Sequence, residues 1–256
     1  MAEYDPALWA SALYALCGQQ ATLDAALLQD VLALLPLGSH RVSATAFVDL
    51  AEAADGTRTA EVGRITRTPD EDGQTSEEWC LHGQPHRGDG PAWQEWDARG
   101  RLIGEAWWGR GQRHRKDGPA VRKWNAHGQV VEETWYVRGQ MHRKDGPAWQ
   151  EWTTEGRLVE EEWCVRNRLH REDGPAWRKW DAEGRLVEEM WCVRGQRHRE
   201  DGPAWRRWDA NGRLVREEWR VSGQKHRQDG PAVRRWDENG RLLMSQRWVR
   251  GVQIEG

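Results

Sequence analysis

An eight-residue phrase, His-Arg-x-Asp-Gly-Pro-Ala followed by Trp or Val, occurs six times in this chain at a constant spacing of 28 residues. A short fixed period means that each unit packs mainly against its neighbours, as in a solenoid or a repeat array. The repeat therefore constrains the fold more than any other feature of the sequence. Its copies begin at His86, His114, His142, His170, His198 and His226.

Each copy predicts one β-hairpin. In the copy that starts at Asp173-Gly174-Pro175, a first strand is expected over Ala176–Trp180 and a turn over Asp181–Gly184. A second strand is expected over Arg185–Arg194, and Gly195–Arg199 then leads to the next Asp-Gly-Pro turn. The predicted fold is mainly β: an elongated single-layer antiparallel β-meander of 28-residue hairpin repeats with a small N-terminal helical cap.

Three segments follow from these patterns. Residues 1–40 are predicted to form a helical hairpin, because Asp5-Pro6 is a good helix start and apolar residues recur at helical spacing. Residues 41–77 are predicted to be a β capping segment with a degenerate first repeat, with strands at Val42–Leu50 and Thr59–Thr68. A helix over Ala44–Ala54 is the alternative for that segment. Residues 78–256 hold the six hairpin repeats.

Charge supports one hairpin register. The first strand of several copies carries a basic pair, such as Arg178-Lys179, and the second strand carries an acidic pair, such as Glu188-Glu189. Closing the Asp181–Gly184 turn brings these pairs close together across the hairpin. Each exposed pair contributes only about 0.2–1 kcal/mol, but their repetition favours one register over a slipped one.

Tryptophan replaces the usual core residues, with 19 Trp against one Phe and three Tyr. The rings fall into three columns, represented by Trp177, Trp180 and Trp191, and the first two are predicted to lie on opposite faces of the sheet. Cys164 and Cys192 share a phase in adjacent repeats. Two strands separate them, about 9.6 Å, so they are expected to stay reduced.

The two parts of the chain differ in charge. Residues 1–78 carry a net charge of −9 and residues 79–256 carry +6, which suggests either an acidic partner for the repeats or contact between the two parts. No segment reads as a membrane span or a signal peptide, so a cytoplasmic location is expected.

The stretch from Trp205 to Trp219, followed by Gly223-Gln224, resembles the MORN repeat and especially its bacterial variant. The shared pattern is aromatic-x-x-aromatic-Asp-x-x-Gly-x-Leu-x-x-Glu-x-x-aromatic, and the resemblance covers about residues 62–256. Two features depart from the family: tryptophan stands at the Phe and Tyr positions, and the connection is longer. The YD repeats of Rhs shells are a weaker resemblance. The MORN resemblance implies a hairpin array used as a binding scaffold, and some bacterial variants are labelled antitoxin or immunity proteins.

The candidate binding residues lie in the repeated phrase. Its arginines, one per connection, are expected to line one edge about 10 Å apart, with the histidines and the first tryptophan column beside them. No catalytic residue, metal site or cofactor is predicted, because a catalytic centre is normally singular and the phrase is copied six times. The candidates are Arg87, Arg115, Arg143, Arg171, Arg199, Arg227, His114, His142, His170, His198, Trp93, Trp149, Trp177 and Trp205.

These residues predict a non-enzymatic scaffold that recognises a protein partner, with an immunity or antitoxin role as one form of it. The alternative is a DNA- or RNA-binding repeat protein in which the Arg and Trp rows follow phosphates and bases. A second alternative is a self-assembling structural protein. Homo-oligomers would then form through the N-terminal helices or through an open sheet edge at Met244–Ile254.

Overall fold

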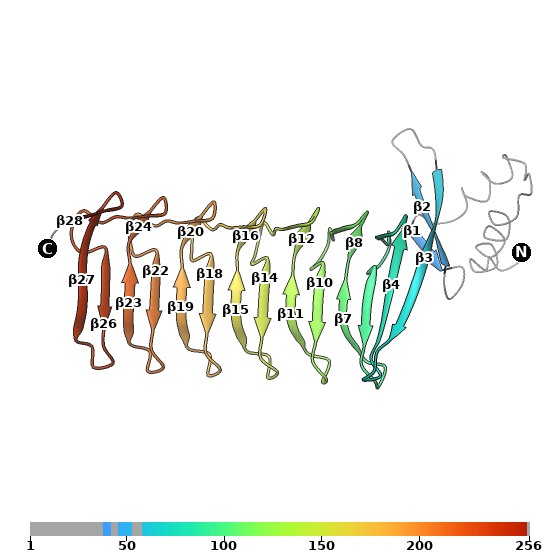
Figure 1. Cartoon of the computed structure of the whole chain (residues 1–256), viewed down its shortest axis with the longest axis horizontal. Helices are drawn as coiled ribbons and strands as arrows, with labels where there is room; N and C mark the ends of the chain where they lie inside the picture. The colour runs from blue at the N-terminus through green and yellow to red at the C-terminus, as the bar shows by residue number, and fades with distance from the viewer. Residues whose placement is uncertain (1–37, 42–45, 53–57, 255–256) are drawn as a thin grey trace, which may run out of the picture. The chain divides into compact units, whose positions relative to one another are not determined.

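A computed structural model describes residues 38–41, 46–52 and 58–254 of the chain. Every regular element in these residues is a β-strand, and each paired strand runs antiparallel to its neighbour, so the mainly β prediction is confirmed (Figure 1). Residues 1–37, where the helical cap is predicted, lie outside the described residues. Within the described residues no helix is long and apolar enough to cross a membrane.

The chain divides into two compact units between Arg115 and Lys116. In the first unit β1 to β4 pair in chain order, β6 pairs with β4, and β7 pairs with β6. A small core forms where Ile65, Trp79, Leu81 and Ala92 pack together with Trp108. The strands are β1 Gly38–Arg41, β2 Ala46–Glu52, β3 Arg58–Pro69, β4 Thr75–Leu81, β5 Gln84–Pro85, β6 Trp93–Trp96, β7 Leu102–Ala106, β8 Trp108–Gly109 and β9 Gln112–Arg113.

The strand prediction for residues 41–68 is confirmed in its main part. β2 and β3 occupy the two predicted segments and pair over seven residues, from Ala46 opposite Arg64 to Glu52 opposite Arg58. The alternative of a helix over Ala44–Ala54 is therefore wrong for the described residues within it. β1 was not predicted, and it adds a strand at Gly38–Arg41.

The second unit is a meander in which each strand of the main sheet pairs with the next in chain order, side by side in one layer (Figure 1). Five hairpins follow one another here, each joined to the next by a short two-stranded ribbon and the His-Arg-x-Asp-Gly-Pro connection. The strands are β10 Val121–Trp124, β11 Val130–Thr134, β12 Tyr136–Val137, β13 Gln140–Met141, β14 Trp149–Trp152, β15 Leu158–Glu162, β16 Cys164–Val165, β17 Arg168–Leu169, β18 Trp177–Trp180, β19 Leu186–Met190, β20 Cys192–Val193, β21 Gln196–Arg197, β22 Trp205–Trp208, β23 Leu214–Glu218, β24 Arg220–Val221, β25 Gln224–Lys225, β26 Val233–Trp236, β27 Leu242–Val249 and β28 Val252–Ile254.

One continuous second strand per repeat was predicted; this holds for the last repeat, where β27 runs unbroken, and is wrong for the repeats before it in the second unit. The predicted strand Arg185–Arg194 breaks at Trp191 into β19 and β20. The break has a backbone cause: the Trp191 amide donates to the Ala204 carbonyl (2.8 Å), while the Trp191 carbonyl accepts from the His198 amide (3.0 Å). Because Trp191 bonds two different segments, the chain leaves the main sheet there. β20 then pairs with β21 as a separate ribbon.

The predicted hairpin register is confirmed, but most of the ion pairs between the basic and acidic pairs join neighbouring hairpins rather than the two strands of one hairpin. Arg178 lies opposite Glu189 and Lys179 opposite Glu188. The ion pairs of this hairpin nevertheless reach back to the preceding one, with Arg178 2.6 Å from Glu161 and Lys179 3.2 Å from Glu160. In the β10–β11 hairpin the pairing is internal, with Arg122 2.8 Å from Glu133. The charges therefore join hairpins as well as close them.

Candidate interaction surface

The repeated arginines stack on tryptophan. Each of the six arginines of the repeated phrase, termed here the connection arginines, places its guanidinium carbon 3.9–4.0 Å from the centroid of a ring in the third tryptophan column. A cation at this distance from an indole face contributes about 0.5–2 kcal/mol, depending on how far it is desolvated. The pairs are Arg87 on Trp79, Arg115 on Trp107, Arg143 on Trp135, Arg171 on Trp163, Arg199 on Trp191 and Arg227 on Trp219.

The Asp and Gly of the phrase hold the arginine on its ring. Arg171 Nε donates to Asp173 Oδ1 at 2.9 Å, and this hydrogen bond lowers the pKa of the Asp173 carboxyl. On the other side of the guanidinium, a Cβ at Gly174 would lie 2.7 Å from Arg171 Cζ. Only glycine leaves room for the stacked side chain, so Arg171 is held between Trp163 and the backbone with a fifth of its side chain exposed (19%).

The other connection arginines find local acceptors too. Arg87 and Arg199 donate to the aspartate two residues later, at 3.1 and 2.9 Å. The Arg143 side chain donates to the Pro147 carbonyl, and the Arg227 side chain donates to the Pro231 carbonyl. The Arg115 side chain donates to the Glu105 carboxylate. The structure thus gives each of these predicted site residues an intramolecular partner, and their binding to another molecule stays a prediction.

Histidines of the repeated phrase fix the next repeat. His170 Nδ1 accepts a hydrogen bond from the Arg194 amide (3.2 Å), and His198 Nδ1 accepts one from the Ser222 amide (3.0 Å). An imidazole that accepts a hydrogen bond at Nδ1 carries its proton at Nε2. The Nδ1 lone pair of these histidines is used by the backbone amide and is not available to a substrate. His86 and His226 make the same bond to the amides of Arg110 and Arg250.

His142 differs from His86, His170, His198 and His226. Its Nδ1 has no hydrogen-bond partner among the described residues. Asn167 stands where the other copies have glycine, and its Oδ1 accepts from the Met141 amide instead (2.6 Å). In the first unit His86 also contacts a carboxylate, with Nε2 2.7 Å from Asp49 Oδ2. Both ring nitrogens of His86 are therefore engaged within the fold.

The predicted tryptophans of the first column are largely covered. Trp93, Trp149 and Trp177 are half-buried, and Trp205 is buried (8% exposed). Arg216 lies 4.8 Å and Arg197 5.3 Å from the Trp205 ring centroid. The Trp177 indole N–H donates to Glu160 at 2.7 Å. These rings serve packing between strands, and their binding role also stays a prediction.

A second arginine row, missed by sequence reasoning, occupies the tips of the short ribbons. In the ribbon of β20 and β21, Arg194 and Gly195 both have positive φ, 53° and 82°, as a two-residue type I′ turn requires. All members of the row are exposed. In the second unit these tip arginines are Arg138, Arg166, Arg194 and Arg250, with φ from 49° to 53°.

The tip arginines share one end of the strands. Figure 1 shows β12, β16, β20 and β24 at one end of the second unit's strands and the Asp-x-x-Gly turns at the other. The side chains of Arg166, Arg194 and Arg250 make no hydrogen bond or ion pair with any residue that the structure describes. The Asn-Gly pair that usually indicates a type I′ turn is absent from these tips. The only sequence feature that could have predicted the turn is a glycine after a short apolar segment.

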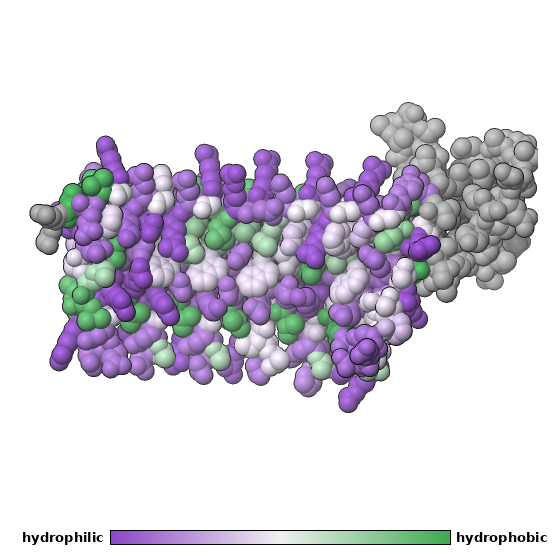
Figure 2. Space-filling view, viewed as in Figure 1, coloured by the Kyte–Doolittle hydropathy of each residue, from purple (hydrophilic) through white to green (hydrophobic). Residues whose placement is uncertain are grey.

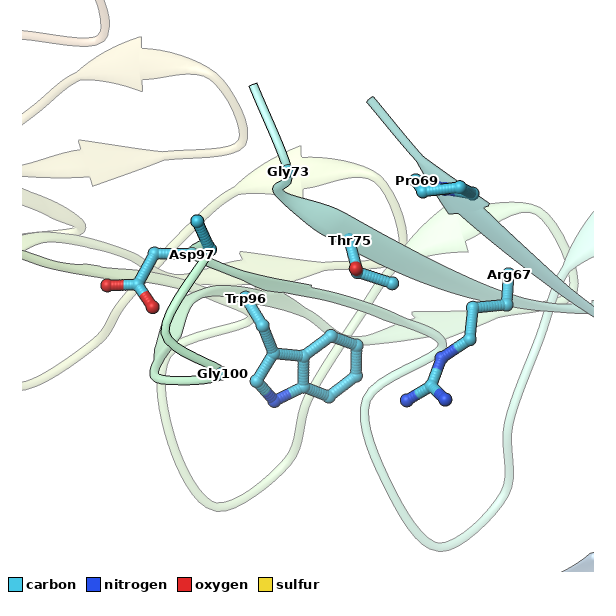
Figure 3. Close-up of a pocket in the computed structure, with 8 residues that line it drawn as sticks. Arg67, Pro69, Gly73, Thr75, Trp96, Asp97 and Gly100 are labelled. Atoms are coloured by element: carbon cyan, nitrogen blue, oxygen red, sulfur yellow. The ribbon is translucent and has the colours of Figure 1, made fainter. Parts of the chain in front are cut away.

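A shallow hollow of about 540 Å³ lies at the turn end of the first unit (Figure 3). Trp96 forms one wall, and the Arg67 guanidinium lies 5.9 Å from its ring centroid. The Asp97 carboxylate is turned away and accepts from the Arg99 and Arg101 amides. The hydrogen bond from the Arg101 amide, and to a smaller degree the one from the Arg99 amide, lowers the pKa of the Asp97 carboxyl. The hollow thus brings no acid–base pair together.

Within residues 38–41, 46–52 and 58–254, no three His, Cys, Asp or Glu side chains are arranged to hold a metal ion. Cys80, Cys164 and Cys192 are free thiols. No protein-family model matches the chain, and no curated protein matches it at a significant level. The resemblance to MORN repeats therefore stays a prediction that rests on the residues quoted for it.

Proposed function

We propose that this chain is a non-enzymatic binding scaffold that recognises a protein partner through the tip arginines of its second unit. The observation that carries the proposal is the backbone at these tips. A left-handed conformation costs a residue with a side chain about 1–2 kcal/mol, and Gly, Asn or Asp adopt it at lower cost. Arginine nevertheless stands at four tips, with φ near 50°.

Strain of this kind is retained where the side chain itself is needed. Arg166, Arg194 and Arg250 extend from the sheet without a described partner, so their guanidinium groups remain available for carboxylates of another molecule. The scaffold sets the spacing of Arg166 and Arg194 at one repeat, about 10 Å. Arg194 and Arg250 are two repeats apart, about 20 Å, because Ser222 stands at the tip between them. The MORN resemblance, with its antitoxin or immunity variants, agrees with a binding role.

Exposed acids beside the tips favour a protein over a nucleic acid. The His170–Arg194 hydrogen bond places the next connection residues, Glu172 and Asp173, near the Arg194 tip, and both side chains are 84% exposed. The following repeat presents Glu200 and Asp201 in the same way, beside the Ser222 tip. A phosphate backbone would meet these carboxylates, whereas a protein surface of mixed charge can complement both signs. The partner is therefore a predominantly acidic segment with some basic residues.

The test uses asparagine at three tips, in the triple variant Arg166→Asn, Arg194→Asn and Arg250→Asn. Asparagine adopts positive φ more readily than arginine, so this variant should fold at least as well as the unchanged chain. Both proteins are used to select binders from a displayed random-peptide library. We expect acidic peptides to be enriched on the unchanged chain, with affinity lost by tenfold or more in the variant.

Arg168→Asn, an exposed arginine in strand β17 with φ outside the left-handed range, is the matched control and should keep the affinity. Failure to enrich any peptide, or equal binding by the variant, would overturn the proposal. Short duplex and single-stranded DNA are titrated in parallel at low and moderate salt. DNA binding that weakens steeply with salt would replace the protein partner with a nucleic acid.

A further inference from the structure

One face of the second unit carries a continuous line of charged residues across its strands. Lys179 of β18 lies directly opposite Glu160 of β15 on one side and Glu188 of β19 on the other. Residues that lie directly opposite each other in an antiparallel pair share a face of the sheet. The same register continues from β10 to β26 with one residue per strand. This line, termed here the charge row, consists in spatial order of Lys123, Glu132, Glu151, Glu160, Lys179, Glu188, Arg207, Arg216 and Arg235.

An acidic block, formed by Glu132, Glu151 and Glu160, occupies three neighbouring strands of the charge row. Glu151 lies directly opposite a glutamate on each side. The outer two glutamates each contact a lysine, with Glu132 Oε2 2.8 Å from Lys123 Nζ and Glu160 Oε2 3.2 Å from Lys179 Nζ. The exposed Glu151 side chain between them makes no hydrogen bond or ion pair with any residue that the structure describes. The acidic block therefore has a surplus negative charge at its centre.

A basic block, formed by Arg207, Arg216 and Arg235, occupies three other neighbouring strands. Arg216 lies directly opposite an arginine on each side, and its Nη2 donates to Glu218 Oε1 at 2.6 Å. Within the described part of the chain, the exposed side chains of Arg207 and Arg235 make no hydrogen bond or ion pair. Like charges directly opposite each other are destabilising, so each block lowers the stability of the isolated chain.

The charge row is antisymmetric in sign about its centre, which falls between β18 and β19. Each residue on one side of this centre has the opposite charge to the residue at the same distance on the other side. Such a surface is complementary to itself after half a turn about an axis through the centre and parallel to the strands. Self-complementarity of this kind is what a two-fold interface requires. The corresponding residues are Lys179 and Glu188, Glu160 and Arg207, Glu151 and Arg216, and Glu132 and Arg235.

We infer that two copies of this chain pack face to face through the charge row, with the two-fold axis parallel to the strands between β18 and β19. Each charge then meets its opposite in the other copy, so Glu151 lies against Arg216 of the second copy. The exposed Arg207 and Arg235 likewise gain a glutamate each. The strands of the two sheets run alongside each other, as in aligned sheet packing. The surface is separate from the tip arginines and does not depend on them.

Charge, rather than apolar burial, selects this pairing. Figure 2 shows hydrophilic side chains spread across the visible surface of the second unit. Eight strands at about 4.8 Å each, with four residues per strand at about 3.3 Å each, give a flat area of about 500 Å² per copy. The total of about 1,000 Å² is at the lower limit for a specific interface. The dimer should therefore be weak and should dissociate as salt screens the charges.

The test reverses one charge on each side of the interface. Glu151→Arg places an arginine against Arg216 of the second copy, and Arg216→Glu places a glutamate against its Glu151, so each variant repels itself twice per dimer. Both changes introduce the charge that other copies carry at the same position, as at Arg207 and Glu188, and both relieve repulsion within the charge row, so both variants should fold.

Sedimentation equilibrium of the unchanged full-length chain at low salt should give twice the mass of one chain, with dissociation on dilution and on addition of salt. In each single variant the dissociation constant of the dimer should rise tenfold or more. Glu238→Arg, the same change at an exposed turn outside the charge row, should leave it unchanged.

An equimolar mixture of Glu151→Arg and Arg216→Glu should recover the affinity, because both contacts in the mixed dimer then join opposite charges. A merely misfolded variant would not recover in this way. The inference is overturned if the unchanged chain is monomeric at all concentrations at low salt, which would leave the charge row to a different charged protein. It is also overturned if both single variants dimerise as tightly as the unchanged chain, or if their mixture dimerises no better than either variant alone.

Discussion

Arg178 forms its ion pair with Glu161 of the preceding hairpin, at 2.6 Å, although Glu189 lies opposite it in its own hairpin. The Glu161 side chain is only 7% exposed and also accepts from the Trp163 indole N–H (3.3 Å). The same carboxylate thus contacts two groups, Trp163 of its own repeat and Arg178 of the next. Substitutions at this boundary between repeats should therefore lower the free energy of unfolding most.

Replacement of Arg178 by methionine should reduce the free energy of unfolding by about 1–2 kcal/mol, because it leaves a buried carboxylate without its cation. Lys179→Met is the control, since Lys179 and Glu160 are more exposed and their pair should contribute less than about 1 kcal/mol. Urea unfolding followed by far-UV circular dichroism measures both. Equal losses in the two variants would contradict this assignment.

Gly174→Ala should displace Arg171 from Trp163, because the new Cβ would lie 2.7 Å from the guanidinium carbon. We expect a loss of about 1–2 kcal/mol in unfolding free energy from the lost stacking and hydrogen bond. In the Arg171→Ala background the same substitution should cost almost nothing. Gly109→Ala, where the added Cβ meets nothing within 4 Å, should be tolerated. Additive effects in the double-mutant cycle would refute the coupling.

His198→Ala should expose the Ser222 amide, which the imidazole accepts from at 3.0 Å. Hydrogen exchange at Ser222 should then accelerate, and unfolding free energy should fall by about 1 kcal/mol. His142→Ala is the matched control, because His142 Nδ1 accepts no hydrogen bond from the described residues. If both variants change exchange at the equivalent amides to the same degree, the histidine does not fix the next repeat.

Cys164 and Cys192 should resist alkylation in the folded chain. Burial, with the Glu162 carboxylate adding to it for Cys164, raises the pKa of Cys164 to about 12 and that of Cys192 to about 11. Iodoacetamide reacts with the thiolate, so both should react far more slowly at mildly alkaline pH than after unfolding in urea. A Cys17→Ser, Cys80→Ser background isolates these two thiols for mass spectrometry.

The same two thiols give a pH dependence. Their folded pKa values lie above the unfolded value, so the stability that they contribute is full below the unfolded pKa and is lost as pH rises toward the folded pKa. In the window from about 9 to 11, each cysteine should lower the unfolding free energy by about 1.4 kcal/mol per pH unit. Cys192→Ala should reduce this slope, and an unchanged slope would rule out Cys192 as its source.

The repeat predicted the hairpins well because its turns and charges are local. The Asp181–Gly184 turn and the opposed pairs of Arg178 and Lys179 with Glu188 and Glu189 lie within about a dozen residues of each other, and they suffice to set the register. Local turns and charges could not predict that Arg178 forms its ion pair with Glu161. That pairing depends on the distance between neighbouring hairpins, which no single copy specifies.

The role of the connection arginines escaped prediction for a related reason. Arg171 and its ring, Trp163, are eight residues apart and separated by a ribbon that was not foreseen, because the Arg166-Asn167 loop lacks the Asn-Gly signal of a type I′ turn. The sequence assigned this row of arginines to a binding surface, and that role stays a prediction, while the stacking of each guanidinium on a particular ring is seen only in the structure. The exposed row belongs to the tips, whose left-handed backbone only the structure reveals.

The histidine bond to the turn of the following repeat spans 24 residues, and its geometry recurs in both units with the 28-residue period. Insertion or removal of a whole period would leave each remaining donor with an equivalent acceptor. Gene duplication can therefore lengthen such an array without new compensating substitutions. Each added copy with an arginine at its tip would add one exposed guanidinium to the row, so the avidity for the proposed repetitive partner would rise with copy number.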